Sequence, residues 1–289
     1  MTVECTTRGP ASKDAYVLGR SARELDRLDL QGIIYRDTTR RALMSGGIGE
    51  GMRVLDAGCG SGDVTRLAGE LVGPSGSVLG IDSDPDSVRA ARRRAAQLES
   101  TNVAFEVGEA ASFAEPESFD ALVARFFLMH QPSPADTLAA AARAVRPGGA
   151  IMMLESHMAG LPDSQHSFPR SATYDQIVRW KCRVVAAAGA DIEAGFGLYR
   201  TFRSAKLPVP EMRMEAPVEG GPDSLIYRYM AESVRSMLPM ADSHEIGGFS
   251  PESVERLEAD LRDEVVESGG VLVCWPVVSA WCRLASAQP

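Results

Sequence analysis

The sequence has few cysteines, and no two of them lie close together. The five cysteines are odd in number and never form a Cys-x-x-Cys pair; they are Cys5, Cys59, Cys182, Cys274 and Cys282. Neither a disulfide framework nor a zinc site is expected from such spacing. The chain is therefore predicted to be a reduced, cytoplasmic protein.

Long apolar segments are also missing. Arg125 interrupts the best candidate, residues 121–130, so no run approaches the roughly 18 apolar residues of a membrane-spanning helix. The first residues, 1–14, contain no apolar stretch of the kind that a signal peptide requires. We expect no membrane partner.

Lysine is scarce, and acidic residues outnumber basic ones. Of 30 basic residues only three are lysine (Lys13, Lys181 and Lys206), and 39 acidic residues give a net charge of −9. Binding to phosphate polymers needs clustered Lys and Arg, so nucleic acid is not expected as a partner. The 289 residues are enough for about two domains of roughly 150 residues, or for one domain with insertions.

From Arg53 onward, short apolar segments alternate with helical ones. Strands are predicted at 53–56, 77–81, 104–107, 121–126 and 150–154, and helices at 86–99 and 134–145. Such alternation is typical of an α/β fold, a Rossmann-like, doubly wound and mostly parallel sheet with helices on both faces.

The flanking regions are predicted to be mainly helical. A capping box at 21–24 opens one helix, and a second spans about 37–44. In the second half, helices are predicted at 172–189, 192–205, 223–238 and 251–268, with strands at 211–216 and 271–284. These late helices are expected to form a cap over one end of the sheet. Its methionines and aromatic residues, Tyr229 among them, are expected in the core of the cap or in a substrate pocket.

Three glycines alternate between the first strand and its helix, in VLDAGCGSG at residues 54–62. In a parallel sheet this turn lies at the carboxyl ends of the strands, where ligands bind close to the backbone and the helix amino terminus. Asp82 comes 24 residues after Gly58, at the end of the next strand. A carboxylate there can accept hydrogen bonds from both hydroxyls of a ribose.

The spacing of this turn distinguishes between two cofactors. Nicotinamide enzymes favour Gly-x-Gly-x-x-Gly, whereas here the third glycine comes one residue earlier and Asp56 precedes the turn. A carboxylate repels a pyrophosphate and attracts an ammonium or sulfonium group. The pattern favours a cationic cofactor without phosphates.

At this point the sequence resembles the class I S-adenosylmethionine-dependent methyltransferases, in particular the bacterial small-molecule enzymes near the ubiquinone and menaquinone group. The resemblance covers residues 50–155 closely, and the first helices, 16–31, are also similar. Its motifs are VLDAGCGSG (54–62), GIDSDPDSV (80–88), FEVGEA (105–110), FDALVARFFLMHQPSP (119–134) and RPGGAIMMLE (147–155). It implies a seven-stranded methyltransferase fold with S-adenosyl-L-methionine as cofactor and S-adenosyl-L-homocysteine as product.

The same resemblance implies which residues contact the methionine part of the cofactor. Gly58, Cys59 and Gly60 would line it through their backbone. Asp56 is a candidate contact on account of its charge, since it precedes the turn. Arg125, at the end of the fourth strand, would lie beside it.

The resemblance also implies contacts to the ribose and the adenine. Asp82 would hold the ribose and Ser83 would flank the adenine, while Glu109 and Ala110 would meet the edge of the adenine. Many members of the family have Asp where this chain has Glu109, and the longer carboxylate can still accept a hydrogen bond from the adenine amino group.

The amino-terminal helices are expected to close over the cofactor. Tyr16 and Gln31 are the candidate contacts. Alternatively, Gln31 belongs to a solvated helix face and Tyr16 packs within the cap.

Methyl transfer needs alignment of the nucleophile and exclusion of water, and it needs a general base only where a hydroxyl must lose its proton. Of the four histidines, His157 is the candidate catalytic base, because it follows the fifth strand at its ligand-binding end. A surface or structural histidine is the alternative.

The function predicted is methyl transfer to an O or N atom of a small organic molecule, a secondary metabolite. The alternatives are C-methylation and a non-catalytic module that binds S-adenosylmethionine. A nucleic-acid methyltransferase is disfavoured because no Pro-Pro-aromatic stretch follows the fourth strand, and an oxidoreductase because no Tyr-x-x-x-Lys pair occurs.

The predicted organisation has two parts. Residues 1–48 form amino-terminal helices that close over the cofactor. Residues 49–289 form the methyltransferase domain, with helical cap insertions at about 157–190 and 222–268. A small-molecule substrate is the expected partner, and a homodimer is left open.

Overall fold

The centre of the computed structural model is a seven-stranded sheet, and the structure describes residues 22–112 and 116–286. Its strand order is β3-β2-β1-β4-β5-β10-β7. Strands β1 to β5 are parallel, and β10 runs antiparallel to β5 and β7. The strands are β1 Arg53–Ala57, β2 Ser77–Asp82, β3 Val103–Val107, β4 Phe119–Arg125, β5 Val145–Ser156, β7 Glu211–Glu215 and β10 Val277–Arg283. The predicted fold class is confirmed.

Alternate residues of the central strands pack on opposite faces of this sheet. Val54, Val123 and Met152 face one hydrophobic core, whereas Leu55 and Leu122 face another. Side chains of a strand point alternately to its two faces, so strands buried on both sides read as continuous apolar runs. The helices α2 Arg36–Ser45, α3 Asp63–Val72 and α4 Pro85–Gln97 cover one face, and α5 Pro134–Ala142 and α7 Ala194–Ser204 cover the other.

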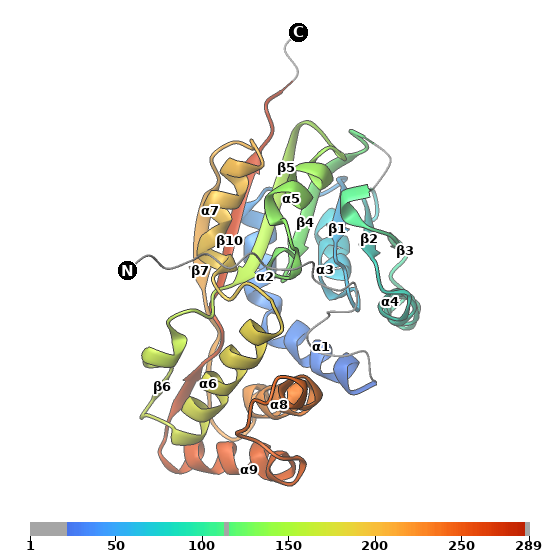
Figure 1. Cartoon of the computed structure of the whole chain (residues 1–289). Coiled ribbons are helices and arrows are strands. Elements are labelled where there is room, and N and C mark those ends of the chain that lie inside the picture. The colour runs from blue at the N-terminus through green and yellow to red at the C-terminus, as the bar shows by residue number, and fades with distance from the viewer. Residues whose placement is uncertain (1–21, 113–115, 287–289) are drawn as a thin grey trace, which may run out of the picture.

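A second layer of structure lies beside the carboxyl ends of the strands (Figure 1). It contains a three-stranded antiparallel sheet in the order β6-β9-β8. Its elements are β6 Ser167–Phe168, α6 Ala172–Ala187, β8 Val218–Gly220, α8 Leu225–Ser243, α9 Pro251–Glu267 and β9 Val271–Val273. We call these elements the cap. The first helix, α1 Ala22–Ile34, packs between the cap and the main sheet and contacts α8.

The predicted helices and strands all appear within the described residues, with boundaries shifted by a few residues. Four differences are larger. Strand β5 begins at residue 145 rather than 150, and the segment predicted as a strand at 271–284 forms two strands, β9 and β10, in different sheets. The small sheet of the cap was not predicted, because strands of two or three residues are too short to show an alternating pattern. Helix α8 continues through Pro239 to Ser243, whereas the prediction ended it at residue 238.

The loop after β4 is held by a buried carboxyl group. Glu155, near the end of β5, accepts backbone N–H bonds from Phe127 at 3.0 Å and Leu128 at 2.7 Å. Its side chain is fully buried, and burial raises the pKa of Glu155 to about 8 although these N–H donors oppose the rise. The loop is thus fixed to the neighbouring strand.

This raised pKa predicts a pH dependence of folding. A carboxyl group whose pKa is higher in the folded than in the unfolded state stabilises the fold below its unfolded pKa, and that contribution is lost as pH rises through the folded pKa of about 8. In Glu155→Gln the amide oxygen can still accept backbone hydrogen bonds, so the decrease in unfolding free energy between pH 5 and pH 8 should be smaller than in the wild type. Urea unfolding at both pH values measures it. The same decrease in both proteins would mean that Glu155 does not cause this pH dependence.

Candidate cofactor site

The glycine turn lies where the strand order reverses. Strand β1 pairs with β2 on one side and with β4 on the other, and the helices that follow β1 and β4, α3 and α5, cover opposite faces of the sheet. Gly58, Gly60 and Gly62 all have positive φ, at 69°, 52° and 82°. A side chain on Gly58 would collide with Phe127, and one on Gly62 with Phe105, whereas a Cβ on Gly60 would meet no atom of the described residues within 4 Å. The first and third glycines therefore allow close packing, and the middle one leaves its backbone open to a ligand.

Asp82 connects the end of β2 to this turn. Its Oδ2 accepts the backbone N–H of Gly60 at 2.9 Å, and its Oδ1 accepts that of Asp84 at 2.9 Å. Burial raises the pKa of Asp82, and these two N–H donors act in the opposite direction. A carboxylate has about four acceptor positions, so those that remain can accept from two ribose hydroxyls.

The residues predicted to contact the adenine gather around Asp82. The carbonyl of Asp82 accepts the N–H of Gly108 at 2.9 Å, which places the turn after β3 beside the end of β2. In that turn Glu109 is exposed and Ala110 is buried, and Ser83 is exposed after β2. The structure therefore brings Asp82, Ser83, Glu109 and Ala110 together.

Cys59 contributes its backbone rather than its thiol. The side chain is buried with Val88, Ala91 and Phe105, between β3 and α4. Its N–H is bonded to the carbonyl of Ile81 at 2.9 Å. Only main-chain atoms of Cys59 are therefore placed to line a ligand.

Asp56 is a buried carboxyl group at the start of the turn. Its Oδ2 accepts a hydrogen bond from Thr65 at 2.6 Å, whereas its Oδ1 is a buried atom with no hydrogen-bond partner among the described residues. Burial raises the pKa of Asp56 to about 7, while the Thr65 hydrogen bond and the Arg125 charge lower it. An ammonium group of a ligand would supply the missing partner and favour the ionised form.

Arg125 links β4 to two helices. Its Nη1 donates to Thr39 Oγ1 of α2 at 2.9 Å, and its Nη2 pairs with Asp63, the first residue of α3. The guanidinium side chain is only 4% exposed. Arg125 thus lies beside the glycine turn, but its charge is already shared with Asp63.

Gln31 and Tyr16 are the two cofactor contacts predicted near the amino terminus. Gln31 lies on α1 and is buried, so the solvated alternative is wrong. Its Oε1 accepts from Arg27 at 2.7 Å and from Tyr229 of α8 at 3.3 Å, which places it between α1 and the cap. Tyr16 lies outside the described residues.

His157 is positioned by β10 and α7. Its N–H donates to the Pro276 carbonyl at 3.0 Å, and its ring stacks on Phe196 with 3.8 Å between the centroids. It follows β5, which is two strands away from β1. The structure therefore does not place His157 with Asp82 and the glycine turn, and a role in catalysis remains a prediction.

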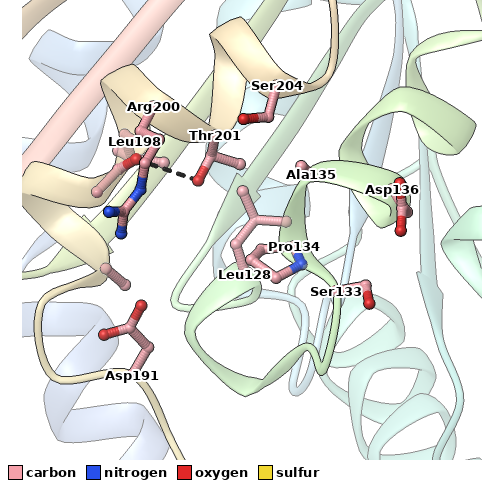
Figure 2. A pocket seen from close by; sticks show the side chains of 12 residues that line it. Leu128, Ser133, Pro134, Ala135, Asp136, Asp191, Leu198, Arg200, Thr201 and Ser204 are labelled. Atoms are coloured by element: carbon pink, nitrogen blue, oxygen red, sulfur yellow. Dashed lines mark hydrogen bonds between the residues drawn. The ribbon is translucent and has the colours of Figure 1, made fainter. Parts of the chain in front are cut away.

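A groove of about 310 Å³ lies between the loop after β4, α5 and α7 (Figure 2). Leu128 and Leu198 contribute to its apolar wall, and its charged residues are Asp136, Asp191 and Arg200. It is on the α5 and α7 side of the sheet, away from Asp56 and α3. The groove is therefore separate from the candidate cofactor site.

Neither a metal-binding cluster nor a membrane-spanning helix occurs in the described part of the chain. No group of three or more His, Cys, Asp or Glu side chains there could hold a metal ion. Among the same residues, no helix is both long enough and apolar enough to cross a bilayer.

The sequence did not identify one group of residues that the structure assembles. Tyr35, Phe126, Lys181, Tyr229 and Trp275 come together where α1, α6 and α8 meet the end of β4. They come from widely separated parts of the chain, so no local pattern marked them. Of these residues only Tyr229, an aromatic residue of the cap, is a candidate for the substrate pocket from the sequence.

Comparison with known proteins places these features in a family. The profile of the family described as "Methyltransferase domain" matches residues 48–205. The chain is 36% identical over 155 residues to an uncharacterized 37.1 kDa protein in a transposon of Streptomyces fradiae, covering 51% of this chain and 44% of that protein. It is 34% identical over 149 residues to the ubiquinone/menaquinone biosynthesis C-methyltransferase UbiE of Pseudomonas savastanoi, covering 50% and 58%. The chain thus spans about half the length of these relatives.

Two solved structures share the fold at low sequence identity. One is a phosphoethanolamine N-methyltransferase of Haemonchus contortus in complex with S-adenosylhomocysteine, with a TM-score of 0.52, 15% identity and coverage of 86% of this chain and 53% of that one. The other is the (4+2)-cyclase SpnF, with a TM-score of 0.52, 21% identity and coverage of 87% and 81%. These likenesses concern the fold alone.

The geometry of Asp82 predicts its effect on cofactor binding. Asp82→Ala removes a charged acceptor, and the loss of hydrogen bonds to it should weaken S-adenosylhomocysteine binding by roughly tenfold to a hundredfold. Calorimetry measures the affinity, and circular dichroism checks that the fold is kept. The exposed Glu106→Gln on β3 is the matched control and should bind as the wild type does. Unchanged affinity in Asp82→Ala would refute the site.

The pKa of Asp56 predicts how binding depends on pH. A cationic ligand favours the ionised carboxylate, so affinity for S-adenosylhomocysteine should rise by about tenfold from pH 6 to pH 8 as a group with a pKa of about 7 loses its proton. Asp56→Asn should bind more weakly at pH 8 and lose most of this dependence. Calorimetry at pH 6, 7 and 8 provides the measurement. If the affinity of Asp56→Asn depends on pH as strongly as that of the wild type, another group causes the pH dependence.

Proposed function

This chain belongs to the methyltransferase-domain family, and from that membership we propose that it transfers a methyl group from S-adenosylmethionine to a small organic molecule. The acceptor atom proposed is oxygen or nitrogen, and the substrate a secondary metabolite. The observation that carries the proposal is the pair of carboxyl groups at or near the ends of β1 and β2, Asp56 and Asp82, next to the glycine turn whose backbone is open at Gly60.

The residues present fit S-adenosylmethionine. Asp56 offers a buried oxygen without a partner to a cationic group, and Asp82 offers acceptor positions to the ribose. The open space over Gly60 admits a ligand against the main chain. When bound, the cofactor supplies a methyl group made electrophilic by a sulfonium. The positively charged Arg125 pairs with Asp63, which limits its repulsion of that cation.

The surrounding helices would exclude water from the bound cofactor and acceptor. We propose that residues 1–48 close over the cofactor and that segments 157–190 and 222–268 enclose the acceptor. Helix α1 is tied to α4 through the Asp29–Arg94 ion pair and to α8 through Gln31 and Tyr229. Such an enclosure suits a small molecule better than a polymer, and the net charge of −9 opposes a nucleic-acid acceptor.

The proposed function has two alternatives, methyl transfer to carbon and cofactor binding without methyl transfer. The relative from Pseudomonas savastanoi is named as a C-methyltransferase, which favours a carbon acceptor. The structural likeness to a cyclase indicates that this fold also occurs in proteins named for other reactions, so a module that binds the cofactor without methyl transfer is the second alternative.

His157 is the proposed general base, which matters only for a hydroxyl acceptor. Its Nδ1 is a buried atom without a hydrogen-bond partner among the described residues, and its ring is held by Phe196. A neutral amine attacks without a base, so the two kinds of acceptor can be distinguished. We further propose a cytoplasmic location and leave a homodimer as an option.

The experiment for methyl transfer uses S-adenosylmethionine labelled with tritium in the methyl group and a panel of phenols, alcohols, amines and activated carbon acids. We expect label in at least one acceptor, and mass spectrometry of the product identifies the atom. S-adenosylhomocysteine should also raise the melting temperature, because it binds only the native state. A clear thermal shift without turnover on any acceptor would favour the non-catalytic module.

The role of His157 is tested with the same assay. For a hydroxyl acceptor, His157→Gln should lower kcat by about a hundredfold or more, and for an amine it should leave kcat nearly unchanged. The matched control is His244→Gln, which alters an exposed histidine after α8. Equal kcat values for wild type and His157→Gln on a hydroxyl acceptor would exclude a base at this position.

A further inference from the structure

Thr65 on α3 donates its hydroxyl to a residue of β1 rather than to its own helix. Its Oγ1 bonds to Asp56 Oδ2 at 2.6 Å, and the residue is fully buried. A threonine in a helix can instead bond to the carbonyl four residues earlier, as Thr201 of α7 does with Gly197 at 3.1 Å. The hydroxyl of Thr65 therefore connects two elements, whereas that of Thr201 stays within its helix.

The neighbouring strand leaves room for this contact. Gly80 of β2 lies opposite Asp56 in the register of the two parallel strands. A Cβ at Gly80 would come within 2.7 Å of Thr65 Oγ1 and within 2.9 Å of Cys59 Cβ. Atoms in a packed interior do not approach so closely, so a side chain at position 80 would displace the hydroxyl. Residues of β1, β2 and α3 thus combine to seat the Thr65 hydroxyl against Asp56.

This hydrogen bond leaves the two carboxyl oxygens of Asp56 in different situations. Oδ2 has its donor in Thr65, whereas Oδ1 is buried and has no hydrogen-bond partner among the described residues. A hydroxyl that donates to a carboxylate fixes its orientation and favours its ionised form. A buried acceptor without a partner is costly to the fold, so Oδ1 points to a donor supplied by a ligand.

The charged and titratable side chains around Asp56 come from the glycine turn, α3, β2 and β4; they are those of Cys59, Asp63, Asp82 and Arg125. Burial has the largest influence and raises the pKa of Asp56 to about 7, and the hydrogen bond from Thr65 is the largest influence that lowers this pKa. Burial also raises the pKa of the Cys59 thiol, which therefore stays neutral. Near pH 7 the ionised fraction of Asp56 responds strongly to any change in its pKa.

We propose that Thr65 is a positioning residue of the cofactor site: its hydroxyl holds Oδ2 of Asp56 and leaves Oδ1 for the ammonium group of the cofactor. Thr65 itself does not touch the cofactor. Because Asp56 attracts the ammonium group only as a carboxylate, Thr65 also sets the pH range in which the cofactor binds. The proposal rests on the function proposed above, since it concerns the cofactor of that same site.

The experiment measures the affinity of the full chain for S-adenosylhomocysteine, which carries the same ammonium group, by calorimetry at pH 7 and pH 8. Thr65→Val removes the hydroxyl and keeps the branched shape, and loss of the hydrogen bond should raise the pKa of Asp56 by about one pH unit. Thr65→Val should then bind about fivefold more weakly than the wild type at pH 7 and only about twofold more weakly at pH 8. A purely structural role would weaken binding by the same factor at both pH values.

Three further variants assign the effect to the contact between Thr65 and Asp56. Thr65→Ser keeps a hydroxyl and should bind as the wild type does at both pH values. In the Asp56→Asn background, Thr65→Val should cause no pH-dependent loss, because the group that titrates is absent. Thr201→Val removes a hydroxyl on the other face of the sheet and should match the wild type. If Thr65→Val does not fold by circular dichroism, Thr65→Ala replaces it with the same expected pattern.

Any of five results would overturn the proposal. They are no loss of affinity in Thr65→Val, the same factor of loss at pH 7 and pH 8, the same loss in Thr65→Ser, the same loss in Thr201→Val, and an equally pH-dependent loss in the Asp56→Asn background. Binding by the wild type separates this proposal from the function proposed above. If the wild type binds and one of these results is found, the role of Thr65 is rejected and the cofactor site stands, whereas no binding by the wild type rejects both.

Discussion

The ion pair between Arg125 and Asp63 holds together the segments that form the candidate cofactor site. It connects the end of β4 to the start of α3, and the second nitrogen of the guanidinium reaches Thr39 on α2. The Arg125 side chain is 4% exposed and that of Asp63 is 21% exposed, so removing Asp63 would leave a buried cation without its counter-charge, which destabilises a fold. The glycine turn immediately precedes Asp63, and Phe126 immediately follows Arg125. This one contact therefore fixes the glycine turn relative to the loop after β4.

The α3 side of this ion pair carries the carboxyl groups of the candidate cofactor site. Asp56 and Asp82 lie at or near the ends of the neighbouring strands β1 and β2, and Asp82 accepts the backbone N–H of Gly60. Such a pair of carboxylates would attract a cationic ligand. On the α1 and α6 side, Arg27 and Lys181 are buried cations near Tyr229.

The sequence predicted which residues gather at the candidate cofactor site, but not the packing of the aromatic group around Tyr35. The glycine turn, the end of β2 and the turn after β3 are each local, so alternation and spacing predicted where Asp82 and Glu109 would meet. The aromatic group is made by contacts such as that of Tyr35 with Trp275, which are 240 residues apart in the chain. Short strands such as β6 left no pattern, and nothing in the sequence around Gln31 indicated its contact with Tyr229 of α8. Local patterns do not encode such long-range packing.

The link between the small and the large sheet fixes the position of the cap relative to the main sheet. Only residues 274–276 separate β9 from β10, and Tyr35 bonds to this link twice, to Cys274 Sγ at 3.1 Å and to the Trp275 carbonyl at 3.0 Å. Rotation of one sheet against the other would have to break both bonds and move Trp275 away from Lys181. A ligand that binds against both parts would meet a surface whose shape is already set, and little ordering entropy would be lost.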